Sequence, residues 1–564
     1  MPTTRAALDR FQAMAVSACG ATLVLAGPGA GKTRTLTEKI LYEVRRGRRV
    51  VAITFTTSAA ALITERLAGE AGLEEAVAIE HIGTLHSYCL RLIRKGGLMR
   101  EIADESMLET LLEEARGHLR LKSALSMTRA LLVWRSRSAE TRAEKLFLRH
   151  VERALEEASL IDYDGILRAA LPFIARQPWR DMTLIVDEMQ DSAAADLAIY
   201  EAAIEAGAEF WAVGDLQQSI FGFRHPVPVD IWGWWHALMD ERGQTAGKWT
   251  LPLNYRSLPA VVECCNVLNT GFAGRIVSKA LPGRSGGTVT LCRKTTEQGM
   301  LQAIAAQVAA SKVPRDQIAV LVRTWKEAEK VAGALAEHGI MYRSKKESKR
   351  AVAGIPALLW AAAAMWQRPN DWRCGRYAAL RWGPEAAARF QAEARAEQRP
   401  LIDFVMPGTA WNPNSEPGDF VAALAILGVS REDEGWMRER LKNVIPESWE
   451  DFALQLFEAP SVEEEGIGVS VLTVHSAKGR EWTEVLVAYC DDFSYRRTTA
   501  LEILADRGEQ DRILFVAASR AIERLTFFYC EVRAAAFGPG TQAVAPAGPL
   551  ARLMEKAGET CGRP

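Results

Sequence analysis

The sequence predicts an α/β protein whose domains are built on parallel sheets, and three observations support this prediction. The chain has 564 residues, too long for one hydrophobic core, so about three to five domains are expected. Apolar runs at 21–26, 182–186 and 469–474 resemble buried strands, and long stretches with helical apolar spacing lie between them. Strands that alternate with helices form parallel sheets, because a parallel pair needs a long crossover connection.

Composition and charge narrow the function classes before any motif is considered. Hydrophobic residues make up 48% of the chain and charged residues 25%, as in an ordinary globular protein, and the formal net charge is -1. Binding to nucleic acid would therefore use local basic patches rather than a uniformly basic surface. The nine cysteines are scattered without a CxxC pair, which fits a reducing cytoplasm better than a disulfide framework or a zinc site. Neither a signal-peptide core nor an uncharged apolar stretch of membrane-spanning length occurs, so we expect a cytoplasmic protein without membrane contact.

The first apolar run leads into "AGPGAGKT", a glycine-rich turn that ends in Lys32 and Thr33. In such a turn the backbone N–H groups and the start of the following helix point at nucleotide phosphates. Lys32 would reach the β and γ phosphates of ATP, while the Thr33 hydroxyl would bind Mg²⁺. The residues predicted to line the nucleotide here are Ala26, Gly27, Pro28, Gly29, Ala30, Gly31, Lys32 and Thr33, with Ala26 in place of the usual first glycine.

The second apolar run, in "MTLIVDEMQDS", ends in Asp187 and Glu188. Asp187 would hold Mg²⁺ through water, and Glu188 would polarise the water that attacks the γ-phosphate. Two adjacent acids suit hydrolysis better than transfer of the phosphate to a substrate hydroxyl. Taken alone, the pair is as often a solvated strand end, so its interpretation depends on the glycine-rich turn that precedes it.

Nine short segments, one of them the acidic segment just described, stand in order along the chain: "FQAMAV", "VAITFTTSAAALITERL", "GTLHSYCLRLIR", "DEMQDS", "AVGDLQQSIFGFR", "LPLNYRS", "IAVLVRT", "VLTVHSAKGREW" and "RILFVAASRA". Together with the glycine-rich turn, they resemble the ordered motifs of the superfamily 1A helicases, the UvrD/Rep/PcrA-like group. So many motifs in one order leave little room for coincidence. The resemblance implies two RecA-like P-loop domains with parallel sheets, each carrying a mainly helical insertion.

The resemblance also implies which side chains contact ATP. Gln12 would read the adenine, Tyr255 would stack on it, Glu481 would take the ribose hydroxyl, and Arg34 would lie near the nucleotide. Arg256 and Arg520 would stabilise charge on the γ-phosphate from two sides, because a guanidinium fork matches phosphate oxygens. Gln218 would link the γ-phosphate to the DNA-binding surface. The implied catalytic set is Lys32, Asp187, Glu188, Gln218, Arg256 and Arg520, with ATP and Mg²⁺ as cofactors and Thr33 and Asp187 as the metal-binding residues.

DNA contacts are implied by the same resemblance. Phe55 and Phe223 match positions that stack on bases of a single strand, and stacking of this kind tolerates any sequence. Polar contacts to the strand fall on His86, Arg323 and His475. For Phe55 the alternative is an ordinary core phenylalanine at a strand end.

The family's four-subdomain plan can be placed on the chain. The predicted parts are domain 1A (1–90 and 164–257), helical insertion 1B (91–163), domain 2A (258–349 and 465–537), helical insertion 2B (350–464) and a flexible C-terminal tail (538–564). Residues 91–153 carry more basic than acidic side chains. This excess suits phosphate contact and a solvated helical face equally well.

Two functions remain open at this point. The first is an ATP-dependent translocase or helicase that moves 3′ to 5′ on single-stranded DNA, with tailed duplex DNA as a further substrate, in repair, replication or genome defence. The second is a DNA-stimulated ATPase subunit that senses DNA ends and regulates a partner nuclease, as in Gabija-type antiphage systems, with the nuclease or a second copy of the chain as partner. A short second insertion without a GIGxKT-like hairpin favours this alternative, whereas the complete ATPase set argues against an inactive DNA-binding scaffold.

Overall fold

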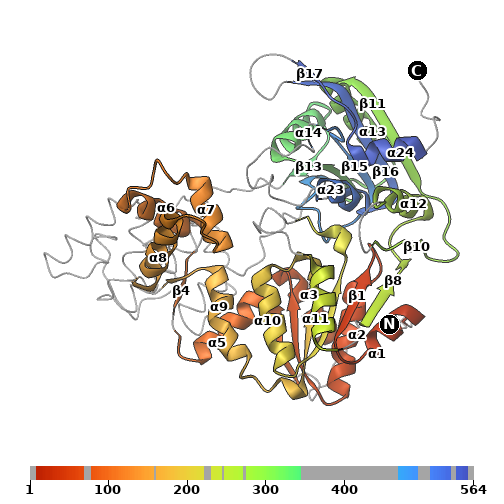
Figure 1. The fold of residues 1–564 in the computed structure, drawn as a ribbon. Helices are drawn as coiled ribbons and strands as arrows, with labels where there is room; N and C mark the ends of the chain where they lie inside the picture. Colours follow the sequence, from red (N-terminus) through yellow and green to blue (C-terminus); the bar gives the residue numbers. More distant parts are fainter. Residues whose placement is uncertain are drawn as a thin grey trace, which may run out of the picture. The chain divides into compact units, whose positions relative to one another are not determined.

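The computed structural model describes residues 8–68, 78–98, 100–103, 105–157, 160–220, 230–243, 247–270, 275–344, 468–492, 494, 509–534 and 541–556. These residues form two large sheets and a separate helical unit (Figure 1). We call the parts built on the first and second sheets domain 1A and domain 2A. Among the described helices, none has both the length and the apolar character needed to cross a membrane.

Domain 1A is a six-stranded sheet in the order β3-β2-β6-β7-β1-β8, with every neighbouring pair parallel. Its strands are β1 (Thr22–Ala26), β2 (Arg49–Thr54), β3 (Ile79–Thr84), β6 (Met182–Val186), β7 (Glu209–Gly214) and β8 (Gly247–Leu251). Its helices are α1 (Arg10–Ser17), α2 (Lys32–Arg45), α3 (Thr57–Ala68), α10 (Ala194–Glu205) and α11 (Ile231–Glu241). Every residue of β1 and of β6 is buried, as expected where helices cover a parallel sheet on both faces.

Domain 2A contains six strands in the order β11-β16-β15-β12-β14-β13, and β17 pairs with β16 in the antiparallel sense. The strands are β11 (Thr288–Thr296), β12 (Ile318–Val322), β13 (Tyr342–Ser344), β14 (Val469–Thr473), β15 (Trp482–Val487), β16 (Ala521–Ala534) and β17 (Thr541–Ala543). The helices are α12 (Pro259–Leu268), α13 (Glu297–Ala310), α14 (Trp325–Glu337), α23 (Glu509–Ala518) and α24 (Gly548–Lys556). Ala319 of β12 is opposite Ser470 of β14, so the chain returns to the same sheet after the long segment that follows β13. The predicted 2B insertion, 350–464, lies outside the described residues.

The helical unit contains residues His86–Phe173 among the described parts of the chain. Its elements are α5 (Leu85–Lys95), β4 (Glu101–Ile102), α6 (Glu105–His118), α7 (Met127–Ser136), α8 (Arg142–Glu157), β5 (Leu160–Ile161) and α9 (Tyr163–Ile174). β4 and β5 form a short parallel pair that joins the two ends of this unit. Arg137 stacks on the Trp134 ring and donates to Asp162 at 2.7 Å, which ties α7 to the loop before α9.

The C-terminal segment differs from the flexible tail predicted for 538–564. Residues Thr541–Ala543 form β17, and Gly548–Lys556 form α24. Ala547 and Leu550 are buried in the core of domain 2A together with residues of α12 and α23. The glycine and proline content of residues 538–549 suggested a flexible linker. The apolar face of the following helix, α24, instead packs onto the core of domain 2A.

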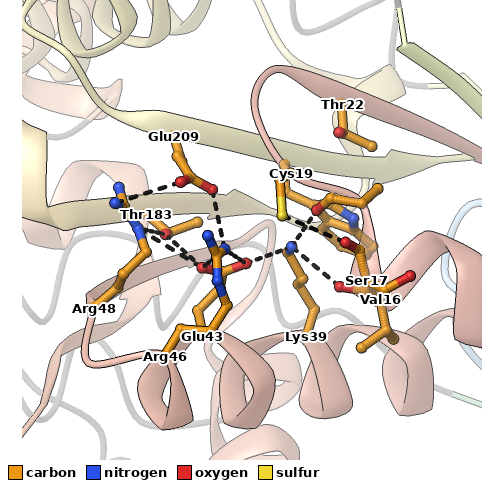
Figure 2. A network of polar contacts seen from close by, with 12 residues as sticks. Val16, Ser17, Cys19, Thr22, Lys39, Glu43, Arg46, Arg48, Thr183 and Glu209 are labelled. Atoms are coloured by element: carbon orange, nitrogen blue, oxygen red, sulfur yellow. Dashed lines mark hydrogen bonds and ion pairs between the residues drawn. The ribbon is translucent and has the colours of Figure 1, made fainter.

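A buried network of polar contacts holds α1 against α2 (Figure 2). Lys39 of α2 donates from Nζ to the carbonyl of Val16 at 3.1 Å and to that of Ala18 at 2.6 Å, where α1 ends. The same ammonium pairs with Glu43, which is fully buried and also accepts from Arg46 at 2.9 Å. Burial lowers the pKa of Lys39, and the nearby Glu43 carboxylate opposes that shift. The network fixes the N-terminal helix on the helix that follows the glycine-rich turn.

Candidate active site

The glycine-rich turn connects the end of β1 at Ala26 with the start of α2 at Lys32. Gly29 and Gly31 have φ values of +66° and +75°, which L-residues with side chains rarely adopt. A Cβ on Gly29 would lie 2.7 Å from Asn254 Oδ1, and one on Gly31 would lie 2.8 Å from Gln12 Nε2. Glycine is therefore required at both positions by conformation and by space.

Gln12 is held against this turn. Asp9 caps α1 by accepting from the backbone N–H of Phe11 and of Gln12. In turn, the Oε1 atom of Gln12 accepts from the backbone N–H of Asp9. The buried Gln12 amide donates from Nε2 to the carbonyl of Ala30 at 3.1 Å. Tyr255 donates its hydroxyl to the other oxygen of Asp9, and burial together with this carboxylate raises the pKa of Tyr255 to about 12. The two residues predicted to contact adenine are thus joined through one carboxylate.

The two acids follow β6 directly. Asp187 donates its backbone N–H to Ile53 O at 2.8 Å, while Glu188 has an unusual φ of +49°. Burial, reinforced by the negative charge of Glu188, raises the pKa of Asp187 well above its ordinary range. Burial acts in the same direction on Glu188, but the positive charges of Lys32 and Lys478 outweigh it and lower the pKa of that carboxyl. Asp187 is buried and Glu188 is partly buried, so these two adjacent carboxyls have opposed electrostatic environments.

A continuous chain of hydrogen bonds leads away from Glu188. Gln190 donates to the Glu188 carboxylate and accepts from the backbone N–H of Asp215 at 2.8 Å. Asp215 accepts from Gln218 Nε2 at 2.7 Å. The Oε1 atom of Gln218 then accepts from Arg520 Nη2 at 2.7 Å. Four bonds therefore connect an acid of domain 1A to an arginine of domain 2A.

The two predicted γ-phosphate arginines share this region. Arg520 is 2% exposed, and burial together with the like charge of Arg256 lowers its pKa to about 9. Arg256 pairs through Nε with Glu481, the predicted ribose contact, and donates from Nη1 to Ser519 O at 3.1 Å. Lys32 Nζ lies 4.0 Å from Glu188 Oε1. Arg34 lies in the first turn of α2, two residues after Lys32, and its positive charge opposes the rise in the pKa of Tyr255.

Two residues that the sequence interpretation did not single out organise these contacts. Asn254 is buried, and its Oδ1 accepts from the backbone N–H of Arg256 at 2.9 Å and of Ser257 at 2.8 Å. Between them, Tyr255 donates its N–H to Gly29 O at 2.8 Å. Lys478 forms an ion pair with Asp191 of the "DEMQDS" segment. Both residues stand inside quoted motifs, and that position was the only signal in the sequence.

The structure places the predicted DNA contacts in different parts of the fold. Phe55 directly follows β2, and Arg323 directly follows β12. His86 belongs to α5 of the helical unit, where its ring meets the Tyr163 ring edge-on at 5.3 Å. His475 Nε2 lies 3.1 Å from Ile220 O, so it contacts domain 1A in this structure. Phe223 lies outside the described residues.

Comparison with known proteins agrees with this geometry. The family model of the UvrD/REP helicase N-terminal domain matches residues 8–131 and 98–231, and that of the UvrD-like helicase C-terminal domain matches residues 426–532. The chain is 24% identical to ATP-dependent DNA helicase Rep of Escherichia coli K12, over 91% of this chain and 89% of that protein. It is also 24% identical to DNA helicase II of the same organism, over 91% and 82%, and to ATP-dependent DNA helicase UvrD1 of Mycobacterium bovis, over 89% and 79%. The chain therefore belongs to the UvrD/Rep helicase family.

Proposed function

We propose that this chain is an ATP-dependent DNA helicase that moves 3′ to 5′ on single-stranded DNA. The observation that supports it best is the hydrogen-bonded path from Glu188 through Gln190, Asp215 and Gln218 to Arg520. Hydrolysis does mechanical work only if its site is connected to a part that moves. This path connects the two RecA-like domains at the place where the γ-phosphate would lie. The relatives are ATP-dependent DNA helicases by name.

In this proposal the nucleotide binds between residues of both domains. The turn and Lys32 hold the phosphates, while Gln12 and Tyr255 hold the adenine. Thr33 and Asp187 would hold Mg²⁺, which would supply positive charge beside the phosphates. Glu188 orients and polarises the attacking water, since its lowered pKa keeps the carboxylate ionised.

Arg256 and Glu481 would both change partners when ATP binds. In this structure they pair with each other. ATP offers each residue a new partner: the γ-phosphate for Arg256 and the ribose hydroxyl for Glu481. Exchange of these partners would bring the guanidinium to the phosphate only when a complete nucleotide is present.

DNA binding would use aromatic and polar side chains of both domains. Phe55 and Phe223 would stack on bases, and His86, Arg323 and His475 would contact the strand. A stacked base contributes roughly 1–3 kcal/mol, independent of sequence, so such a surface holds any single strand.

The test is a strand-displacement assay run beside an ATPase assay. Duplexes with a 3′ tail, a 5′ tail or blunt ends are compared, with Lys32→Ala as the inactive control. The proposal predicts unwinding of the 3′-tailed duplex, little unwinding of the others, and ATP turnover that single-stranded DNA stimulates. Stimulated turnover without unwinding of any duplex would favour the alternative, an ATPase subunit that regulates a nuclease. Preference for the 5′ tail would refute the proposed polarity.

A further inference from the structure

Three consecutive backbone carbonyls of domain 1A accept hydrogen bonds from three different side chains of domain 2A. The contacts are Lys478 Nζ to Gln218 O at 3.0 Å, Arg512 Nε to Ser219 O at 2.7 Å, and His475 Nε2 to Ile220 O at 3.1 Å. A carbonyl only accepts, so the proton of the His475 ring is on Nε2 in this contact. The donors come from the loop after β14 and from α23.

The side chain of Ile220 strengthens this attachment. Ile220 is fully buried, and it belongs to the hydrophobic core that contains Leu321, Trp482 and Phe515 of domain 2A. Residues 218–220 therefore belong to domain 1A in sequence, between β7 and α11, but are anchored in domain 2A by backbone and side chain together. Burial of the Ile220 side chain removes apolar surface from water, so detaching residues 218–220 from domain 2A would cost free energy.

The residues just before this segment are fixed in domain 1A instead. Asp215 directly follows β7, and its backbone N–H donates to Gln190 Oε1 at 2.8 Å. Gln218 donates two hydrogen bonds to Asp215: its backbone N–H donates to the Asp215 carbonyl at 2.8 Å, and its Nε2 donates to the Asp215 carboxylate at 2.7 Å. Any movement of one domain relative to the other must therefore act on the short turn between Asp215 and Gln218.

We infer that Arg512, Lys478 and His475 are positioning residues that attach the Gln218–Ile220 segment to domain 2A, so that domain movement sets the orientation of Gln218. None of the three needs to touch ATP for this role. The Gln218 side chain bonds Asp215 on one side and Arg520 on the other, so a shift of its backbone breaks or aligns the path to Glu188. The inference rests on the proposed function, because DNA-stimulated ATP turnover is one of its readouts.

Arg512 gives the sharpest test of the three. Lys478 also pairs with Asp191 near the acids, so its loss would disturb the active site directly. Arg512 lies in α23 beside Asp511, which pairs with Arg552 of α24 at 3.1 Å. Arg552→Gln therefore perturbs the same helix without removing a contact to domain 1A, and it serves as the matched control.

The experiment compares the full chain with its Arg512→Gln, Arg512→Lys and Arg552→Gln variants. It measures ATP turnover with and without single-stranded DNA, the KM for ATP, and hydrogen exchange of peptides covering residues 216–220. Arg512→Gln is expected to lower DNA-stimulated kcat about tenfold, with KM within about twofold of wild type, because a charged donor to the backbone is lost. Exchange in the 216–220 peptides should become faster, Arg512→Lys should recover part of both effects, and Arg552→Gln should match wild type.

Wild-type kcat and unchanged exchange in Arg512→Gln would overturn the inference. So would an equal loss in Arg552→Gln, since the effect would then come from α23 as a whole. If DNA fails to stimulate even the wild-type chain, the proposed function is wrong. The exchange of the 216–220 peptides then decides the inference by itself, because attachment to domain 2A does not require DNA.

Discussion

Arg520 Nη2 lies 2.7 Å from Gln218 Oε1, although 302 residues separate the two in sequence. Arg520 is almost fully buried, and Gln218 donates from Nε2 to the carboxylate of Asp215. A buried guanidinium is stable only where its donors have partners, so this contact belongs to the fold of the domain pair. The contact joins Arg520, the side chain predicted to stabilise charge on the γ-phosphate, to Gln218, the side chain predicted to link the γ-phosphate to the DNA-binding surface.

Arg520→Ala should lower ATP turnover strongly while ATP binding changes little. The guanidinium stabilises charge that develops during phosphoryl transfer, and such an arginine typically contributes about 10³–10⁵ in kcat. The measurement is steady-state kcat and KM beside nucleotide affinity by fluorescence titration. Arg524→Ala, on the half-exposed face of β16, is the control and should be close to wild type. A normal kcat in Arg520→Ala would show that domain 2A has no part in hydrolysis.

Glu188→Gln should bind ATP and Mg²⁺ but hydrolyse ATP about 10²–10⁴-fold more slowly, because the amide cannot accept a proton from water. The amide keeps the size of the side chain and its place beside Gln190. Rapid-quench measurement of a single turnover separates the chemical step from product release. Loss of ATP affinity as large as the loss in rate would point to a structural role for Glu188.

Asn254→Ala should impair turnover although Asn254 contacts no predicted nucleotide atom. Its Oδ1 satisfies the N–H groups of Arg256 and Ser257, and leaving buried donors unpaired costs about 1–3 kcal/mol each. We expect a lower unfolding midpoint and a lower kcat, since Tyr255 and Arg256 lose their fixed geometry. Asn254→Asp keeps the acceptor oxygen and should recover much of both. Equal loss in the two variants would contradict the role of Oδ1.

Lys39→Met should destabilise domain 1A and weaken ATP binding. Removing one partner of a buried ion pair typically costs about 3–5 kcal/mol, because Glu43 is left with less compensation. The bonds to Val16 and Ala18 are lost as well, so α1 and Gln12 should become less fixed. Chemical denaturation and the KM for ATP measure the two effects, with the exposed Lys326→Met as control. An unchanged KM for ATP in Lys39→Met would show that the Lys39–Glu43 network does not contribute to nucleotide binding.

The sequence predicted the local parts of the site and missed those that depend on the second domain. The positions of Lys32 and Asp187 in the fold could be predicted because a strand leads into a glycine-rich turn, and the acids after a second strand could be interpreted together with that turn. The partners of Lys478 and Arg512 could not be predicted, because each is decided by how separate segments of the chain come together. The sequence predicted that Gln218 links the γ-phosphate to the DNA-binding surface, but only the structure shows its hydrogen bonds to Asp215 and Arg520. The predicted tail failed for a similar reason, since burial of Leu550 depends on a distant core.

The most direct test of the proposed coupling is directional movement on single-stranded DNA. Oligonucleotides carrying biotin at the 5′ or the 3′ end are loaded with streptavidin, and its ATP-dependent displacement is followed beside ATP turnover. We expect faster displacement from the 5′ end, because the chain would move 3′ to 5′, and loss of both displacement and ATP turnover in Lys32→Ala. Displacement that does not depend on which end is blocked, or ATP turnover that single-stranded DNA does not change, would contradict it.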